Sequence, residues 1–236
     1  GMETRAGDLD PKLLRALTCA GLTSLLLGLE SGSPRLLGRI GKGQRRETGA
    51  AAVALCREAG LDPEVGFIMF LADSRLEDLR ENLAFLSACG LLDRLDRTAN
   101  LLGHRQIVLA GTSGYGRLQA AGRLTPSGFL GFEGRVAMAD HRVAWLQEVA
   151  LAACHQVLRR MGDPRSAIHW QAPHGSAHAR VNRALVDLFG ELLDAAAGIP
   201  PGEPAAEAAY RAIQTVERAL AGPRTTTDEP WKGPSA

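Results

Sequence analysis

The chain of 236 residues is poor in cysteine and carries almost no net charge. Its four cysteines stand singly, without a C-x-x-C pair, which excludes a disulfide scaffold and indicates buried thiols. They are Cys19, Cys56, Cys89 and Cys154. Lysine and arginine number 27 against 26 aspartates and glutamates, a net charge of +1, which disfavours nucleic acid or an anionic membrane as a partner.

Long apolar runs are also absent. No run approaches the roughly 18–20 residues of a membrane span, and the start GMETRAGDLD lacks the basic and apolar regions of a signal peptide. We therefore expect a cytoplasmic protein with no membrane partner. The 45% hydrophobic and 22% charged residues are typical of globular chains, and the length allows one large domain with a helical extension.

Helical and strand patterns alternate over residues 2–139. Apolar runs bounded by turn residues predict buried strands, and leucines at helical spacing predict the helices between them. The expected strands are 22–32, 63–71 and 105–111, and the expected helices are 10–20, 47–60, 74–90 and a short one within 114–124. Ser74 and Glu77 fit a capping box for the clearest of these helices. The order predicts an α/β fold, a parallel sheet covered by helices.

After Asp140 the pattern changes to helices alone. Residues 140–162, 178–198 and 207–222 have helical periodicity with no strand between them. They predict an α-helical C-terminal subdomain over 140–221. The last residues, 222–236, are rich in proline, glycine and threonine, and we expect a mobile tail there.

The segment from Glu3 to Leu124 resembles part of a radical S-adenosylmethionine barrel. The run G-L-E-S-G-S at 28–33 is followed by Lys42-Gly43, then by GFIMFLAD at 66–73 and RQIVLAG at 105–111. These runs are similar to the middle and later strands of such enzymes, of the type that also carries a cobalamin-binding domain. The resemblance implies a partial (β/α) TIM-like barrel, the carboxyl-terminal half of the enzyme.

The resemblance also implies contacts to S-adenosylmethionine. Glu30 and Ser31, at the end of a buried strand, correspond to polar contacts to the ribose or amino-acid part of the cofactor. The residues themselves leave another interpretation open, in which Glu30 bonds backbone groups of the next loop and Ser31 caps a helix.

The strand at 63–71 is similar to the family pattern G-x-I-x-G-x-x-E. Gly66 and Ile68 match it, and Ile68 would pack on the adenine or, as an alternative, in the core. Asp73 takes the place of the final glutamate. Phe70 replaces the second glycine and would fill space that glycine leaves open for a ligand.

The resemblance places Gln106 and Val108 on the later strand beside the adenine. Together with Glu30, Ser31, Gly66, Ile68 and Asp73 they form the expected cofactor-binding set.

The family's C-x-x-x-C-x-x-C loop is missing from this sequence. Its thiolates would hold a 4Fe–4S cluster, so we expect no cluster and no radical chemistry from this chain alone. Cobalamin is not expected within this chain either. S-adenosylmethionine should bind only weakly, because its anchor on iron is absent. Met2 is either an internal methionine of a longer gene or the start of a truncated relative. The alternative function is a non-catalytic homodimeric or partner-binding module that retains the fold.

A partial barrel leaves one side of its sheet open. Leu25, Leu27, Ile68 and Phe70 are expected to point toward that side, where missing strands would otherwise pack. Either a second copy in a homodimer, a missing N-terminal barrel half, or the C-terminal helices must cover it.

We interpret a cluster of histidines and a cluster of basic residues as structural rather than functional. His169, His174 and His178 could suggest a metal site, but Pro173 and Gly175 break the helix and no carboxylate lies among them, so we interpret a surface loop and expect no metal. The basic residues Lys42, Arg45 and Arg46 are interpreted as a solvated face.

Overall fold

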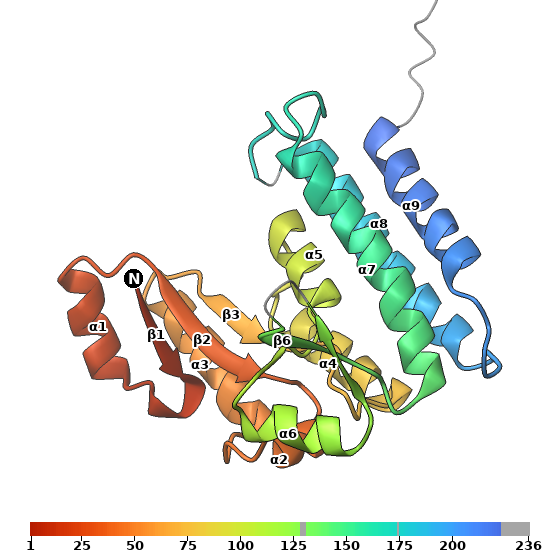
Figure 1. Cartoon of the computed structure of the whole chain (residues 1–236). Helices are drawn as coiled ribbons and strands as arrows, with labels where there is room; N and C mark the ends of the chain where they lie inside the picture. Colours follow the sequence, from red (N-terminus) through yellow and green to blue (C-terminus); the bar gives the residue numbers. More distant parts are fainter. Residues whose placement is uncertain (128–130, 174, 223–236) are drawn as a thin grey trace, which may run out of the picture.

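A computed structural model describes residues 1–127, 131–173 and 175–222. Three parallel strands, β1 (Met2–Arg5), β2 (Leu25–Glu30) and β3 (Glu64–Phe67), form a sheet in that order (Figure 1). Met2 lies opposite Leu25, and Leu26 lies opposite Glu64. One isolated parallel bridge, between Phe70 and Arg105, continues the arrangement beyond β3. The expected strands at 22–32 and 63–71 are confirmed as the parallel strands β2 and β3, while closure into a larger barrel stays a prediction.

The helices beside this sheet follow from their caps and apolar faces. Helix α1 (Pro11–Cys19) begins with proline in its first turn, and the Asp10 carboxylate accepts a hydrogen bond from the Leu13 N–H at 2.7 Å. Helix α3 (Arg46–Glu58) buries Ala52, Val53 and Cys56 and packs against β2. Both helices agree with the sequence expectation.

The expected facing of the strand residues is corrected. Leu25 and Leu27 are fully buried in the main core, and Leu27 pairs with Val65 of β3. Ile68 follows the end of β3, and the pairing register shifts between Gly28 and Glu30, so Ile68 does not continue the alternation of Leu25 and Leu27. Leu26, between Leu25 and Leu27 in β2, is 36% exposed. The pairing register sets which residues share a face, and a pattern within single strands does not contain it.

Helix α4 (Leu76–Ala88) is confirmed, but its predicted capping box is wrong. The Ser74 hydroxyl accepts a hydrogen bond from the Leu71 N–H at 3.0 Å, inside the preceding turn. The carboxylate of Asp78, not of Glu77, accepts from the Arg75 N–H at 2.7 Å. The helix therefore starts one residue later than the box implies.

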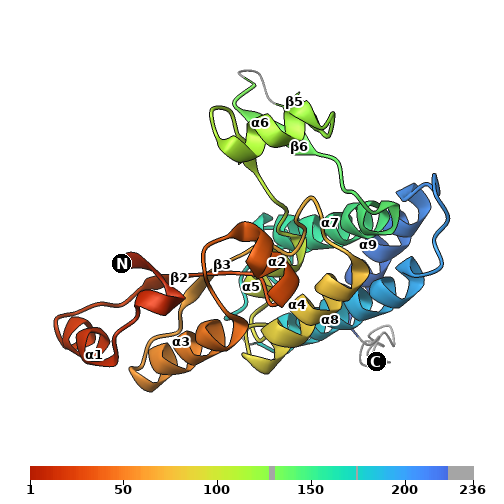
Figure 2. The ribbon, with the colours of Figure 1, turned by 90° about the horizontal axis from the view of Figure 1, so that it is seen from below.

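The expected third strand is mostly wrong. Only β4 (Val108–Leu109) forms, and it pairs antiparallel with β6 (Glu133–Val136), which in turn pairs with β5 (Leu124–Ser127). The expected short helix is confirmed as α6 (Ser113–Ala120). With β5 and β6 it forms a lobe that projects from the body in Figure 2. Strand β5 is short and polar, so its sequence pattern gave no strand signal.

Three further elements were not predicted: the 3-10 turn η1 (Ala6–Asp8), α2 (Pro34–Ile40) and α5 (Leu95–Gly103). Helix α2 has the usual start and stop signals of a helix, with Pro34 in its first turn and Gly41 as a left-handed C-terminal cap at φ 73°. Its seven residues are too few to show a periodic pattern.

The three C-terminal helices are confirmed as α7 (His141–Gly162), α8 (Ser176–Ala196) and α9 (Ala206–Ala221). They pack on one another, and α7 and α8 pack on α5. One continuous core runs from Ala6 near the start to Val216 in α9. The boundary at 139/140 stays a prediction, and the expected tail lies outside the described residues apart from Gly222. No helix in the described ranges combines the length and apolarity needed to cross a membrane.

Candidate functional site

A cavity of about 670 Å³ opens at the carboxyl ends of β2 and β3. Its wall comes from those strand ends and the segment after β3, from α2 and the loop after it, and from α6 and the turn that follows it in the projecting lobe. The cationic side chains around it are Arg39, Lys42, Arg117 and Arg123, and the anionic ones are Glu30 and Asp73. Carboxyl ends of parallel strands are where α/β folds bind ligands.

Glu30 occupies a strained position at the edge of this cavity. Its backbone φ is 64°, and no other non-glycine residue in the described chain has a positive φ. The Ile68 N–H donates to its carbonyl at 2.8 Å, and the Ser31 N–H donates to the Leu29 carbonyl at 2.8 Å. The Glu30 carboxylate lies 2.5 Å from the Lys42 ammonium, with the side chain 16% exposed. The strained turn therefore directs a paired carboxylate to the cavity.

Helix α4 holds the loop after Glu30 in place through Asn82. The side-chain oxygen of Asn82 accepts hydrogen bonds from the Ser31 hydroxyl, the Gly32 N–H and the Ser33 N–H, at 2.8, 2.7 and 3.2 Å. Ser31 is 1% exposed and does not line the cavity. It also caps no helix, because its hydroxyl accepts from the Ser33 N–H within the loop. The structure places Ser31 in the support of the site.

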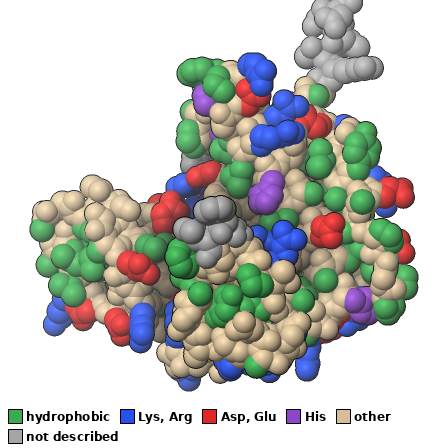
Figure 3. All heavy atoms as spheres, viewed as in Figure 1, with side chains coloured by type: hydrophobic (Ala, Val, Ile, Leu, Met, Phe, Trp, Pro, Cys, Tyr) green, Lys and Arg blue, Asp and Glu red, His purple; other side chains and the backbone are tan. Residues whose placement is uncertain are grey.

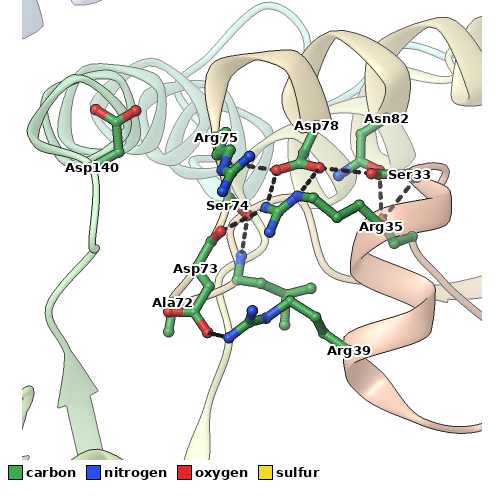
Figure 4. Close-up of polar contacts among 12 residues, drawn as sticks. Ser33, Arg35, Arg39, Ala72, Asp73, Ser74, Arg75, Asp78, Asn82 and Asp140 are labelled. Atoms are coloured by element: carbon green, nitrogen blue, oxygen red, sulfur yellow. Dashed lines mark hydrogen bonds and ion pairs between the residues drawn. The ribbon is translucent and has the colours of Figure 1, made fainter. Parts of the chain in front are cut away.

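Asp78, one helical turn before Asn82, binds the same segment. Its carboxylate accepts from the Ser33 hydroxyl at 2.7 Å and is paired with the Arg35 guanidinium. Burial acts to raise the pKa of Asp78, but the hydrogen bonds from Arg35, Ser33 and the Arg75 N–H outweigh it and hold the pKa below its ordinary value. Figure 4 shows Arg35 between Asp78 and Asp73.

Asp73 joins the body to the projecting lobe. Its carboxylate lies 2.6 Å from Arg123 and 2.5 Å from Arg39. Arg123 also donates to the carbonyls of Ala72 and Ala137. The hydrogen bond from Arg123, and then that from Arg39, lower the pKa of Asp73 against the effect of burial. Asp73 thus carries its negative charge between two arginines.

Two further residues of the expected set line the cavity next to the strand ends. Ile68 lines it, and so does Gln106, whose side-chain oxygen accepts from the Ala72 N–H at 3.0 Å. Gly66 lies beside Gly28 in the sheet, so neither strand has a side chain there. Val108 is instead buried in a small cluster with Ala72 and Val136.

The expected obstruction by Phe70 is wrong. Phe70 is fully buried and does not line the cavity. Its ring packs on that of Phe189 in α8, with the centroids 6.2 Å apart. The C-terminal helices receive this side chain, which sequence positions 66–73 alone could not indicate.

Of the expected cofactor-binding set, the structure brings Glu30, Ile68, Asp73 and Gln106 together around the cavity. Sequence reasoning missed Arg39, Arg117 and Arg123. It also interpreted Lys42 as part of a solvated face, whereas Lys42 is paired with Glu30. The Lys42-Gly43 step of the resemblance was the available signal for Lys42, while no local signal distinguishes Arg123, whose partners lie far away in sequence.

Cysteines and histidines do not gather into a ligand set in the described part of the chain. Cys56, Cys89 and Cys154 are buried in separate elements, and burial raises the pKa of Cys154 to about 12. The expected surface loop of histidines is corrected at His178, which is buried in α8 and bonded to the Ile168 carbonyl. His169 contacts the Met161 carbonyl, and His174 lies outside the described residues.

No family model matches the chain. A stretch of 76 residues, 32% of the chain, is 38% identical to 4'-phospho-dehydrooxetanocin synthase of Priestia megaterium and covers 10% of that protein. The structure of the cobalamin-dependent S-adenosylmethionine radical enzyme OxsB with aqua-cobalamin bound matches 93% of this chain and 42% of its own, with a TM-score of 0.69 and 17% identity.

The OxsB structure with both aqua-cobalamin and S-adenosylmethionine bound matches 83% of this chain and 33% of its own, with a TM-score of 0.58 and 18% identity. The chain therefore spans less than half of OxsB and a tenth of the synthase. Over that span, it has the fold of part of a cobalamin-dependent radical S-adenosylmethionine enzyme.

Proposed function

We propose that this chain is the carboxyl part of a radical S-adenosylmethionine enzyme of the cobalamin-dependent type, and that its 670 Å³ cavity receives the adenosyl part of the cofactor. The observation that carries the proposal is the place of Glu30. A carboxylate in a strained turn, at the end of a parallel strand and facing a cavity, is a fixed acceptor for ligand hydroxyls.

The neighbouring residues support an adenosyl ligand. Glu30 would accept hydrogen bonds from the ribose hydroxyls, and Lys42, paired with the same carboxylate, would hold it in place. Ile68 offers an apolar contact for the adenine, and Gln106 offers an amide beside it. The volume lies within the roughly 300–1,000 Å³ usual for small-molecule sites.

We propose that the iron–sulfur cluster and the cobalamin are held by residues outside this chain. In radical S-adenosylmethionine enzymes the cluster supplies the electron that cleaves the cofactor. The described cysteines are dispersed, and three of them are buried in apolar surroundings, which disfavours the thiolate form that binds iron. Without that anchor the chain should bind the cofactor weakly and should not be active alone.

Calorimetry with S-adenosylmethionine tests the proposal. We expect a dissociation constant above roughly 100 μM, because only the adenosyl contacts remain. Glu30→Ala should abolish the binding heat, and Glu47→Ala, at an exposed glutamate of α3, should leave it unchanged. Low-micromolar binding that is the same in Glu30→Ala would contradict the proposal.

A second candidate, a partner-binding module, rests on the open edge of the sheet. Strand β1 pairs only with β2 in the described structure, and Met2 and Leu26 are 42% and 36% exposed. Unpaired edges recruit further strands. We propose that a barrel half or a second copy of the chain covers this edge, and sedimentation over a wide concentration range distinguishes the homodimer from the monomer.

A further inference from the structure

The projecting lobe of α6, β5 and β6 has a small apolar cluster of its own, separate from the main core. Among the described residues, its buried members are Val108 and Val136, together with Ala72 from the body. Leu109 and Phe132 are 50% and 64% exposed, and Figure 3 shows hydrophobic side chains on the surface of the lobe. Because little apolar surface is buried between lobe and body, the lobe is bound less firmly than the elements of the main core.

Two extended segments connect the lobe to the body (Figure 2). The first leaves the sheet at Gln106, whose side-chain oxygen accepts a hydrogen bond from the Ala72 N–H at 3.0 Å. The second returns to α7 through Ala139, whose N–H donates to the Ala72 carbonyl at 2.9 Å. Both connections are therefore bonded to the same residue of the body. Two short connections that lie side by side are suited to act as a hinge.

Arg123 ties the lobe to the body next to this hinge. It lies in the turn after α6, and its guanidinium is 2.6 Å from the Asp73 carboxylate, the only ion pair that joins lobe and body in the described parts of the chain. The same guanidinium donates to the Ala72 carbonyl and to the Ala137 carbonyl of the lobe. The Arg123 and Asp73 side chains are 25% and 33% exposed, so water can reach the pair and the contact can open.

Helix α6 has an apolar side that borders the 670 Å³ cavity. None of the residues of α6 is buried. Leu118 of α6 and Ala121 after it line the cavity, and Leu36 and Ile40 of α2 line it from the body. These side chains lose water only when a ligand fills the space between them or when the lobe moves closer.

We propose that the lobe is a lid on the cavity. It opens as a unit about the two connecting segments when the pair between Arg123 and Asp73 breaks, which admits a ligand. A ligand in the cavity covers the apolar side of α6 and so favours the closed lobe, because it has more contacts in that state. Only the identity of the ligand rests on the proposed function.

Hydrogen exchange of the full chain without ligand, followed by mass spectrometry, tests the lid. We expect Arg123→Gln to speed exchange about tenfold at the Ala72 and Ala139 amides, which the closed lobe protects. The amides of the β5–β6 ladder are bonded within the lobe and should keep their wild-type rates. Asp73→Asn should have the same effect, and the double variant should add nothing to it, because both changes break one contact.

The matched control is Arg135→Gln in β6. Arg135 is an exposed arginine of the same lobe, and its side chain has no hydrogen bond or ion pair in the described structure. Unchanged rates at Ala72 and Ala139 in Arg123→Gln, or the same acceleration in the Arg135 control, would overturn the lid. Equal acceleration along the β5–β6 ladder would also overturn it, since the lobe would then unfold rather than move.

Exchange in the presence of S-adenosylmethionine, at several millimolar, keeps this inference apart from the proposed function. We expect slower exchange at the Ala72 and Ala139 amides of the wild type, and no such protection in Glu30→Ala. If the Arg123→Gln result holds without ligand but the cofactor protects neither amide, the lid stands and the proposed cofactor site fails. If the cofactor protects both amides while Arg123→Gln changes nothing, the cofactor site stands and the lid fails.

Discussion

Gly32 leaves no room for a methyl group. A Cβ at this position would clash with the Phe85 side chain and would lie 2.8 Å from its Cγ. Because Phe85 is buried in the core and stacked on Phe67, it cannot move away cheaply. Glycine at this point lets the loop after Glu30 lie directly on α4.

We expect Gly32→Ala to lower the free energy of unfolding by about 1–3 kcal/mol, the usual cost of overpacking a core. Urea denaturation measures it. The matched control is Gly38→Ala in α2, where a Cβ meets nothing within 4 Å and the helix should gain roughly 0.5–1 kcal/mol. Equal urea midpoints for wild type and Gly32→Ala would contradict the clash.

At the scale of elements, α4 is the support of the candidate site. Asp78 and Asn82 are four residues apart and therefore lie on one face of the helix, which binds the segment from Ser31 to Arg35. The loop that carries Glu30 is thus positioned by a helix about fifty residues away in sequence.

Asp78 should make the free energy of unfolding depend on pH in the acid range. Its pKa in the folded protein lies below the ordinary 3.8, so its contribution is fully present above about pH 4 and is lost as the pH falls through the lowered pKa. We expect Asp78→Asn to lower the free energy of unfolding at pH 7 by about 1–3 kcal/mol and to reduce the acid-dependent loss. Urea denaturation at pH 7 and at about pH 3 measures both.

The comparison variant is Asn82→Ala, which removes a neutral partner of the same loop. It should also cost about 1–3 kcal/mol, because three donors lose their acceptor, but by a similar amount at both pH values. The test compares, for each variant, the stability lost relative to the wild type at pH 7 with that lost at about pH 3. If this loss changed with pH as much in Asn82→Ala as in Asp78→Asn, the acid dependence would not belong to the Asp78 carboxylate.

At the scale of the whole molecule, the C-terminal helices complete the core. Phe70 contacts Phe189 of α8, the Asn82 helix is bound to α8 through Arg80 and the Leu193 carbonyl, and α5 is covered by α7 and α8. We expect a chain ending at residue 139 to lose its cooperative thermal transition by circular dichroism, since these apolar contacts would face water. A monomeric, cooperatively unfolding truncation would disprove this.

Reconstitution with iron and sulfide tests the chain as a whole for a cluster. We expect no stable absorption near ~400 nm after gel filtration, because the thiols are dispersed through the described fold. A stoichiometric four-iron cluster that survives gel filtration would contradict both this expectation and the proposal that the cluster residues lie elsewhere.

The sequence by itself determined the elements with strong local patterns. Apolar runs gave β2 and β3, leucine spacing and caps gave α1, α3 and α4, and the absence of strands after Asp140 gave the three long helices. These signals are local, because the pattern of one buried face and the capping residues can be recognised within a short stretch of sequence. The same applies to Glu30, which the order of residues places at the end of a buried strand.

Only the tertiary structure decided the rest of the site. The antiparallel lobe depends on pairing between β4 and β6, and the direction of Phe70 depends on a helix more than a hundred residues away. Asp73 becomes a junction because Arg39 and Arg123 reach it from two separate elements. Strand register and the need of a buried charge for a partner determine such long-range pairings. Neither produces a periodic pattern in the sequence.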